Sequence, residues 1–287
     1  MSPLRSWRAW VATVLACAAP LLAAEAPPPS GLKVATVGHS FHVWMAPLVA
    51  QMAKAAGIVG HEQLATSFIG GSKVVQHWDL PPAKDKVKPL LEAGRLDVFT
   101  MSPAFLPDPG MERFIRLGLG PAPRLRFTIQ QNWVPYDDPA LWYAPVKPKV
   151  VERDAATLPQ LRAKHDPYFK AIEEQVRELR KQFPETSIVL VPCGEAVLRL
   201  RAEVIAGTAP GIDSQAQLFT DALGHPGPQI RVLAAYCHFA TMYRRSPVGL
   251  PVPPDLARSP RSAELNRRLQ EIAWEVVGAH PMSGVTR

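Results

Sequence analysis

The chain has 287 residues, of which 47% are hydrophobic and 20% are charged, and its formal net charge is +7. This length suits one large domain or two small ones, and the composition supplies a sizeable core, which excludes a globally disordered chain. The Lys and Arg residues form no dense block and no nucleic-acid-binding motif is present, so the basic excess does not predict a nucleic-acid partner.

The first 26 residues have the organisation of a secretory signal peptide. Arg5 and Arg8 precede an uncharged apolar stretch over residues 9–24, and Ala24 and Ala26 supply small residues at the positions that define cleavage. The apolar stretch is too short to span a membrane comfortably, and no second stretch long enough follows it. We therefore expect an exported protein, periplasmic or extracellular, with a short proline-rich spacer at 27–30.

The cysteines leave two questions open. A lipoprotein signal ending at Cys17 is the minor alternative, because the leucine before it stands one place too late for a good lipobox. Export would permit a disulfide between Cys193 and Cys237, although two buried, unpaired thiols fit the sequence equally well. Neither cysteine has the spacing of a metal ligand.

Five short apolar runs rich in β-branched residues follow the signal. Each is nearly continuously apolar, which is typical of strands buried on both faces of a parallel sheet. They are residues 32–37, 63–69, 96–101, 125–130 and 188–191.

Helical periodicity appears between and after these runs. One helix is expected over 41–56, ending near Gly57, and another from an N-terminus at Asp166-Pro167 to about residue 183. Further helices are expected over 194–206, over 228–243 and from Ser262 to about Gly278.

Alternation of strands and helices predicts an α/β protein, a three-layer α/β/α sandwich with a central parallel sheet. We expect one domain over residues 31–287. Residues 135–165, where prolines are frequent, are predicted to form an irregular insertion, because proline interrupts regular structure.

Four segments that follow strands carry residues suited to chemistry at the carboxyl edge of the sheet. Ser40 follows the first strand at the start of a helix, and His225 lies on a loop bounded by Gly and Pro with Asp221 nearby. A histidine there suits a general base, and a carboxylate can fix its tautomer. Gly71 and Asn132 follow the second and fourth strands and offer N–H donors to an oxyanion. Each segment alone also fits an ordinary helix cap, turn or loop.

Taken in order, these segments resemble the blocks of SGNH/GDSL hydrolases. The resemblance rests on Gly38-His39-Ser40-Phe41, Gly70-Gly71-Ser72 with His77-Trp78, Asn132, and the segment from Asp221 to Pro226, and it covers most of residues 32–249.

The resemblance implies a role for each matching residue. Ser40 would be the nucleophile, His225 the base and Asp221 the residue that orients it. The backbone N–H groups of Ser40 and Gly71 and the side chain of Asn132 would form the oxyanion hole, with Gly70 the less favoured substitute for Gly71. No metal and no organic cofactor are implied, and the reaction would pass through an acyl-enzyme.

The sequence departs from the family pattern at two places. His39 stands before the nucleophile, where the family usually has Asp or Asn. Ala222 occupies the position three residues before the histidine, where the family has its acid, so that Asp221 lies four before His225. A loop with one extra residue would still deliver Asp221; otherwise a backbone carbonyl would hold His225 as part of a dyad.

Other histidines and tryptophans lie near these blocks. A metal site made of the N-terminal histidines is a minor alternative, since their spacings match no standard ligand pattern. Aromatic faces near a hydrolytic site suit sugar rings, although core or rim packing is the simpler interpretation. The residues concerned are His39, His42, His61, His77 and Asp79 for the metal, and Trp44, Trp78 and Trp133 for substrate binding.

The leading hypothesis is an exported serine esterase that hydrolyses small, acetyl-like acyl esters of a small molecule or a glycan. The main alternative is a catalytically inactive SGNH-type fold that binds glycan or cell-wall material, which the His39 and Asp221 departures favour. A metal-dependent hydrolase is the third hypothesis. Reactivity of Ser40 toward acylating probes would separate the first two.

Overall fold

The computed structural model describes residues 29–138 and 151–286. The predicted signal peptide at 1–26, part of the spacer and residues 139–150 of the expected insertion lie outside the described residues.

All five predicted strands are present and form one parallel sheet. In space they follow the order β2-β1-β3-β4-β5. Strand β1 pairs with both β2 and β3, with Val34 beside Gln63 on one side and beside Val98 on the other. The bounds are β1 Lys33–Gly38, β2 Glu62–Phe68, β3 Val98–Met101, β4 Arg126–Gln130 and β5 Ile188–Val191.

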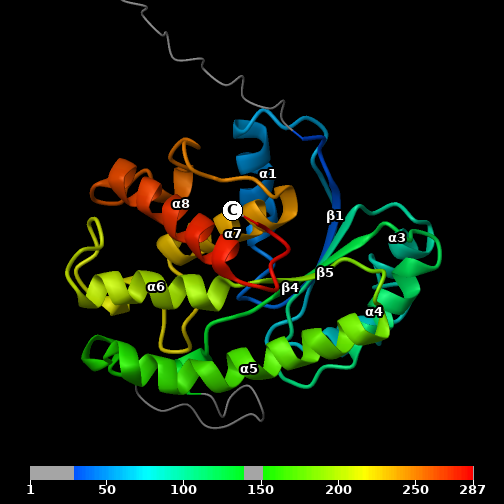
Figure 1. Cartoon of the computed structure of the whole chain (residues 1–287), viewed down its shortest axis with the longest axis horizontal. Coiled ribbons are helices and arrows are strands. Elements are labelled where there is room, and N and C mark those ends of the chain that lie inside the picture. Colours follow the sequence, from blue (N-terminus) through cyan, green and yellow to red (C-terminus); the bar gives the residue numbers. More distant parts are fainter. Residues whose placement is uncertain (1–28, 139–150, 287) are drawn as a thin grey trace, which may run out of the picture.

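Helices cover both faces of the sheet, which confirms the predicted three-layer α/β/α architecture (Figure 1). One layer contains α1 Met45–Ala55, α6 Cys193–Ile205, α7 Pro228–Tyr243 and α8 Ser262–Ala279. The other contains α2 Val74–Trp78, α3 Lys88–Glu92, α4 Gly110–Leu119 and α5 Leu158–Gln182. Short 3-10 turns occupy Pro135–Asp137, Arg153–Ala155, Gln215–Leu218 and Pro254–Leu256.

The helix expected to begin at Asp166-Pro167 begins earlier. Helix α5 starts at Leu158, and Pro167 lies inside it. Thr157 caps the helix together with Gln160, whose Oε1 accepts the backbone N–H of Thr157 at 2.9 Å. The predicted N-terminus was wrong because a capping box upstream outweighs the proline signal within the helix.

The layer between the sheet and helices α1 and α7 contains buried polar groups. His42 Nε2 lies 3.1 Å from Thr100 Oγ1, and His238 Nε2 lies 2.8 Å from Gln130 Oε1. The two imidazole rings are 5.3 Å apart. Burial lowers the pKa of His238 to about 3 and holds that of His42 well below its ordinary value, so both are neutral near pH 7.

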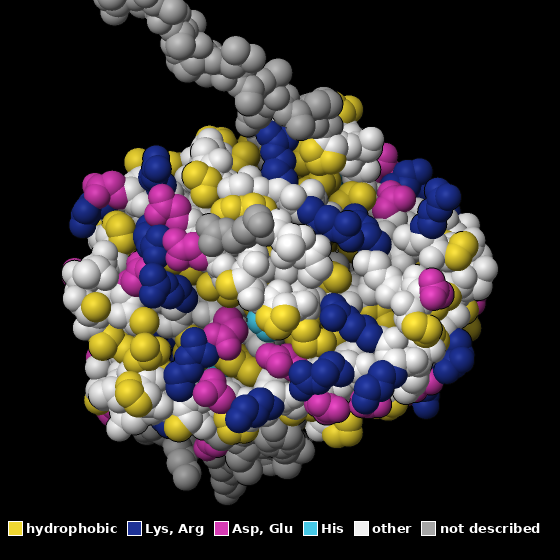
Figure 2. Space-filling model, viewed as in Figure 1, with side chains coloured by type: hydrophobic (Ala, Val, Ile, Leu, Met, Phe, Trp, Pro, Cys, Tyr) yellow, Lys and Arg dark blue, Asp and Glu magenta, His cyan; other side chains and the backbone are white. Residues whose placement is uncertain are grey.

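Charged side chains of both signs are mixed on the face shown in Figure 2. On α8, Arg268 pairs with Glu203 at 2.7 Å and with Glu271 at 3.0 Å. The net positive charge therefore forms no single basic field on this face.

Cys193 and Cys237 are both buried and free. Burial raises the pKa of the Cys193 thiol, which keeps it protonated. Within residues 29–138 and 151–286, no helix is long and apolar enough to cross a bilayer.

The buried histidines predict a specific loss of stability in mild acid. Burial lowers the pKa of His39 and His238 to about 3 and of His77 and His165 to about 4. Below pH ~6.5 these histidines bind protons in the unfolded chain but not in the native state. The free energy of unfolding therefore falls as the pH drops from about 6.5 towards 4. Each such histidine contributes at most about 2 kcal/mol of this loss at pH ~5.

Urea unfolding at about pH 7 and about pH 5 measures this effect. His238→Gln keeps a donor to Gln130 but cannot be protonated, so its loss of stability between the two pH values should be smaller than that of the wild type. A wild-type stability that does not change over this interval would contradict the prediction.

Candidate active site

The structure places Ser40 at the point where the strand order changes direction. The chain passes from β1 to β2 on one side and then crosses to β3 on the other, so the carboxyl ends of β1 and β3 mark a topological switch point. Ser40 follows β1 by two residues, and Ser102 directly follows β3. Ligands of open α/β sheets bind at such an edge.

Ser40, His225 and Asp221 form a continuous hydrogen-bonded chain. His225 Nε2 lies 2.8 Å from Ser40 Oγ, and His225 Nδ1 lies 2.6 Å from Asp221 Oδ2. The His225 side chain is 33% exposed and that of Asp221 is 45% exposed, so solvent reaches this chain. This is the geometry in which an imidazole takes a proton from a serine while a carboxylate holds its tautomer.

Asp221 also stabilises the loop that carries it. Its Oδ1 accepts the backbone N–H groups of Gly224 at 2.9 Å and of His225 at 3.1 Å. Burial pushes the pKa of Asp221 upward, but hydrogen bonds from the His225 ring and from these two amides outweigh it and lower the pKa below its ordinary value. Asp221 is therefore ionised near pH 7.

The four-residue spacing between acid and base is accommodated by glycine. Gly224 has φ +100°, a conformation that side chains rarely adopt. The turn lets Asp221 fold back onto His225 although Ala222 occupies the position where the family has its acid.

The base of the loop is closed by backbone pairing. Phe219 and Pro226 form an antiparallel bridge, and the Thr220 N–H donates to the carbonyl oxygen of His225 at 2.9 Å. The Gly227 N–H donates to the carbonyl oxygen of Leu218 at 2.8 Å. His225 therefore lies on a closed, ordered loop.

The nucleophile lies on a tight turn before α1. Trp44 Nε1–H donates to the carbonyl oxygen of Ser40 at 2.7 Å, and His42 and Val43 both donate their backbone N–H to the carbonyl oxygen of His39. Trp44 also packs against Arg231, whose guanidinium lies 5.6 Å from the ring.

His39 supports this turn as a buried, neutral base. Its Nδ1 accepts the backbone N–H of Phe41 at 3.3 Å, and its Nε2 lies 3.2 Å from Ser102 Oγ. Burial lowers its pKa to about 3, against a hydrogen bond to the backbone of Pro103 that raises it. The departure at this position thus places a hydrogen-bonding side chain, without charge, beneath the nucleophile.

Two backbone N–H groups in the turns after β1 and β2 are candidate oxyanion donors. The N–H groups of Ser40 and Gly71 donate to no described residue. Gly71 is exposed, has φ +58°, and has open space where a side chain would stand. The turn is anchored by His77, which bridges Ser67 Oγ and Ser72 Oγ at 2.8 Å each. Backbone N–H groups without an acceptor at the carboxyl edge of the sheet are suited to binding an oxyanion.

Asn132 differs from the expected third oxyanion donor. The side chain is buried, and its Nδ2 already donates to Ser102 Oγ at 3.0 Å and to the carbonyl oxygen of Pro103 at 3.3 Å. Its Oδ1 accepts from Gln130 Nε2 at 2.5 Å. In this arrangement Asn132 holds Ser102 and Pro103 from within and presents no free donor.

The three tryptophans are packed, and one correction is clear. Trp133 is buried and stacks on Phe41 at 4.9 Å, so it has no open face for a substrate. Its Nε1–H donates to the carbonyl oxygen of Gly224 at 2.9 Å, so it holds the histidine loop instead. Trp78 is half-buried, with Phe114 against its ring edge to face and the Lys88 ammonium 5.2 Å above it.

Sequence reasoning missed several buried residues that hold the site. Gln130 donates to the carbonyl oxygen of Phe41 at 2.8 Å as well as to Asn132, and Ser102 contacts both His39 and Asn132. The one available signal was the polar pair Gln130-Gln131 at the end of an otherwise apolar strand.

The residues considered for a metal site make other contacts. His61 Nδ1 lies 2.6 Å from the Tyr243 hydroxyl, and Asp79 pairs with Arg113 at 3.4 Å. His77 is held between two serines, as described above. Among the described residues, no three His, Cys, Asp or Glu side chains are grouped as a metal site requires.

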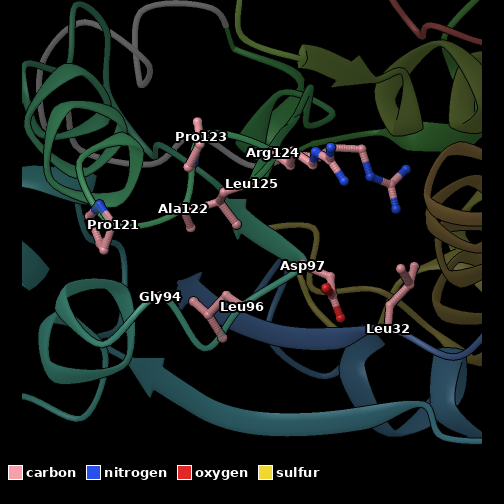
Figure 3. Close-up of a pocket in the computed structure, with 10 residues that line it drawn as sticks. Leu32, Gly94, Leu96, Asp97, Pro121, Ala122, Pro123, Arg124 and Leu125 are labelled. Carbon is pink, nitrogen blue, oxygen red and sulfur yellow. The ribbon is translucent and has the colours of Figure 1, made fainter.

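A surface pocket of about 440 Å³ lies at the opposite edge of the sheet (Figure 3). Its lining comes from the starts of β1, β3 and β4, and includes Leu32, Asp97 and Arg126. Because Ser40 lies at the carboxyl edge, this pocket is separate from the candidate active site.

Comparison with known proteins gives similarity at the level of structure. No protein-family model and no curated protein matches this sequence. A solved DUF4886 family protein from Bacteroides uniformis matches with a TM-score of 0.60 and 16% sequence identity, covering 90% of this chain and 98% of that one. At this identity the match shows a shared fold.

Other structural neighbours include hydrolases of the type that the sequence resembles. A candidate GDSL-like lipase from Parabacteroides merdae has a TM-score of 0.42 with 12% identity, covering 74% of this chain and 95% of that one. A candidate SGNH hydrolase from Slackia heliotrinireducens has a TM-score of 0.44 with 17% identity, covering 74% and 99%. Both proteins are structural neighbours of this chain at low sequence identity.

The packing role of Trp133 predicts an asymmetry between two tryptophans. Trp133→Phe keeps the stack on Phe41 but leaves the buried Gly224 carbonyl without its donor, which should lower the free energy of unfolding by about 1–3 kcal/mol. Trp78→Phe is the matched control, because the Trp78 indole N–H donates to no described residue; it should cost less. Urea unfolding measures both, and equal losses would contradict the role assigned to the indole N–H.

Proposed function

We propose that this chain is a serine ester hydrolase that removes small acyl groups through an acyl-enzyme. The observation that carries the proposal is the bridge made by His225, whose two ring nitrogens lie 2.8 Å from Ser40 Oγ and 2.6 Å from Asp221 Oδ2. The roles follow from these contacts and from the resemblance to SGNH/GDSL hydrolases.

In the proposed mechanism, Ser40 Oγ attacks the ester carbonyl carbon while His225 Nε2 accepts the hydroxyl proton. The backbone N–H groups of Ser40 and Gly71 stabilise the oxyanion that forms. The tetrahedral intermediate expels the alcohol, to which His225 returns the proton. Water, deprotonated by His225, then attacks the acyl-enzyme and releases the carboxylic acid, with the proton returned to Ser40. Asp221 stabilises the imidazolium at both stages.

The assembled geometry favours an enzyme over an inactive binding protein. The sequence features that supported an inactive fold were His39 and the position of Asp221. Neither prevents assembly, because His39 is a buried neutral hydrogen-bonding group and Asp221 contacts the His225 ring directly. A chain kept only for binding would have no need of this alignment.

The proposed substrate is an ester of a small acyl group, and its alcohol need not be a sugar. Trp133 is buried and Trp78 packs against neighbouring side chains, so these two offer little to a sugar ring. Export is part of the proposal and rests on the sequence of residues 1–26 alone.

The first test is hydrolysis of p-nitrophenyl acetate by the chain from residue 27 onward. Ser40→Ala and His225→Ala should each lower kcat by at least about 10³-fold, because the groups of such a unit act together. Ser246→Ala, on the loop after α7, is the control and should keep wild-type activity.

A fluorophosphonate probe tests the nucleophile independently of the substrate. It should label wild type and Ser246→Ala on the peptide that contains Ser40, and should not label Ser40→Ala. A wild type that is neither labelled nor active on acyl esters, acetylated glycans included, would exclude the hydrolase and favour the binding protein.

Processing gives a separate prediction. Expression of the full chain in a bacterial host should yield an exported protein whose first residue is Pro27, because Ala24 and Ala26 define the cleavage site. Mass spectrometry of the intact protein measures this. An N-terminus at a lipid-modified Cys17 would instead support the lipoprotein alternative, and an unprocessed cytoplasmic chain would contradict export.

A further inference from the structure

A buried charge cluster lies beneath the loop that carries His225. It contains two arginines, Arg153 and Arg201, and one acid, Asp137, all of them buried. Arg201 donates two parallel hydrogen bonds to the carboxylate of Asp137, from Nη1 at 2.7 Å and from Nη2 at 2.9 Å. Gln215 joins the arginines, accepting from Arg201 Nε at 2.8 Å and donating to the carbonyl oxygen of Arg153 at 2.8 Å.

Arg153 extends from this cluster to the loop itself. Its Nη2 donates to the carbonyl oxygen of Ala222 at 2.9 Å, and its guanidinium lies 4.3 Å from the centre of the Phe219 ring. Ala222 lies between Asp221 and His225, and Phe219 begins the same loop. A single side chain thus contacts the loop both through its backbone and through its packing surface.

Three consecutive carbonyl groups of the loop are held from outside. The Ala222 oxygen accepts from Arg153, the Leu223 oxygen accepts the Tyr136 N–H at 2.9 Å, and the Gly224 oxygen accepts from Trp133 at 2.9 Å. This is the stretch that holds the extra residue between acid and base. Of these three hydrogen-bond donors, only the side chain of Arg153 carries a charge.

Among the described residues, no carboxylate forms an ion pair with Arg153, because the acid of the cluster pairs with Arg201. Burial raises the pKa of Asp137, but the hydrogen bonds and charge of Arg201 outweigh burial and lower that pKa below its ordinary value. Asp137 is therefore an ionised carboxylate paired with Arg201. His165 lies 3.8 Å from Asp137, and burial lowers its pKa to about 4, so it is neutral near pH 7.

The guanidinium of Arg153, the remaining positive charge of the cluster, interacts with the carboxylate of Asp221. Burial lowers the pKa of Arg153, and so does the charge of Arg201, whereas the carboxylates of Asp137, Asp221 and exposed Asp154 raise it. Interaction between two charges is mutual, so Arg153 favours the ionised form of Asp221.

We propose that Arg153 is a positioning residue for the hydrolase proposed above: it fixes the Ala222 peptide and supplies the positive charge behind Asp221, so that an acid four residues before the histidine can orient it. Arg153 contacts neither the substrate nor Ser40. It acts through the loop, and Arg201 and Asp137 hold the segment from which it extends.

The test compares Arg153→Lys, which keeps the charge and a donor, with Arg153→Met, which keeps the length and loses both. On p-nitrophenyl acetate, Arg153→Met should lower kcat by about 10- to 100-fold with little change in KM, because a small displacement of catalytic groups costs that much. Arg153→Lys should recover most of the lost kcat. If Arg153→Met does not fold, Arg153→Gln, which keeps a donor without the charge, takes its place in the same measurements.

Arg180→Met is the matched control. Arg180 likewise donates to two backbone carbonyl oxygens, those of Ile188 at 2.7 Å and Met282 at 2.8 Å. Neither acceptor belongs to the loop at residues 219–227. It should lose stability while its kcat stays at the wild-type value.

Amide hydrogen exchange over residues 219–227 separates this inference from the proposed function, because it needs no activity. Exchange there should be faster in Arg153→Met than in wild type, and unchanged in Arg180→Met. If the wild type is inactive but the loop exchanges as expected, the hydrolase fails while the anchoring stands. Wild-type exchange together with wild-type kcat in Arg153→Met, or no recovery by Arg153→Lys, would overturn the inference.

Discussion

The hydrogen bond between His225 Nε2 and Ser40 Oγ joins two segments 185 residues apart in the sequence, and the candidate site depends on it. Neither partner lies in a strand or helix. The sheet brings their segments to one edge, but a 2.8 Å contact between two loops requires each loop to be fixed separately. The turn of Ser40 is fixed by Trp44 and His39, and the loop of His225 by its own Asp221 and by residues outside it.

Much of that fixing is done by polar groups inside the core. Gln130 is the clearest case, since its amide contacts the Phe41 carbonyl, Asn132 and His238 at once, and so links the nucleophile turn to β4 and α7. A buried amide of this kind stabilises only while its partners are present, because an unsatisfied buried polar group costs about 1–3 kcal/mol. This makes the orientation of each group depend on the others, and it explains why Asn132 faces inward: its oxygen is the acceptor that Gln130 requires.

The sequence was informative where one-dimensional patterns reflect burial. Strands of a parallel sheet are covered on both faces, so their apolar runs could be found within a residue or two, and residues 228–243 match α7. Ser40 could be proposed because it follows a strand, His225 because it lies between Gly and Pro, and Asp221 because it is a carboxylate near His225 in the sequence. The structure brings the three together. Packing was not predictable: the exposure of Trp133 depends on Phe41, which is 92 positions away in the chain, and the inward direction of Asn132 depends on Gln130 and Ser102. The start of α5 was missed because Pro167 is a strong local signal that the helix tolerates.

The displaced acid shows how such tertiary contacts bear on a motif. In sequence, moving an acid by one position looks like a broken motif, since the added peptide could turn the carboxylate away from the histidine. In the structure the added length is absorbed by Gly224 in a left-handed conformation, and the carbonyls of Ala222, Leu223 and Gly224 are each held by a donor outside the loop. The spacing rule therefore describes one loop geometry, whereas the chemistry requires only that a carboxylate reach the imidazole Nδ1. A chain with another spacing can meet that requirement when its surroundings hold the loop. Here the surroundings include the buried guanidinium of Arg153.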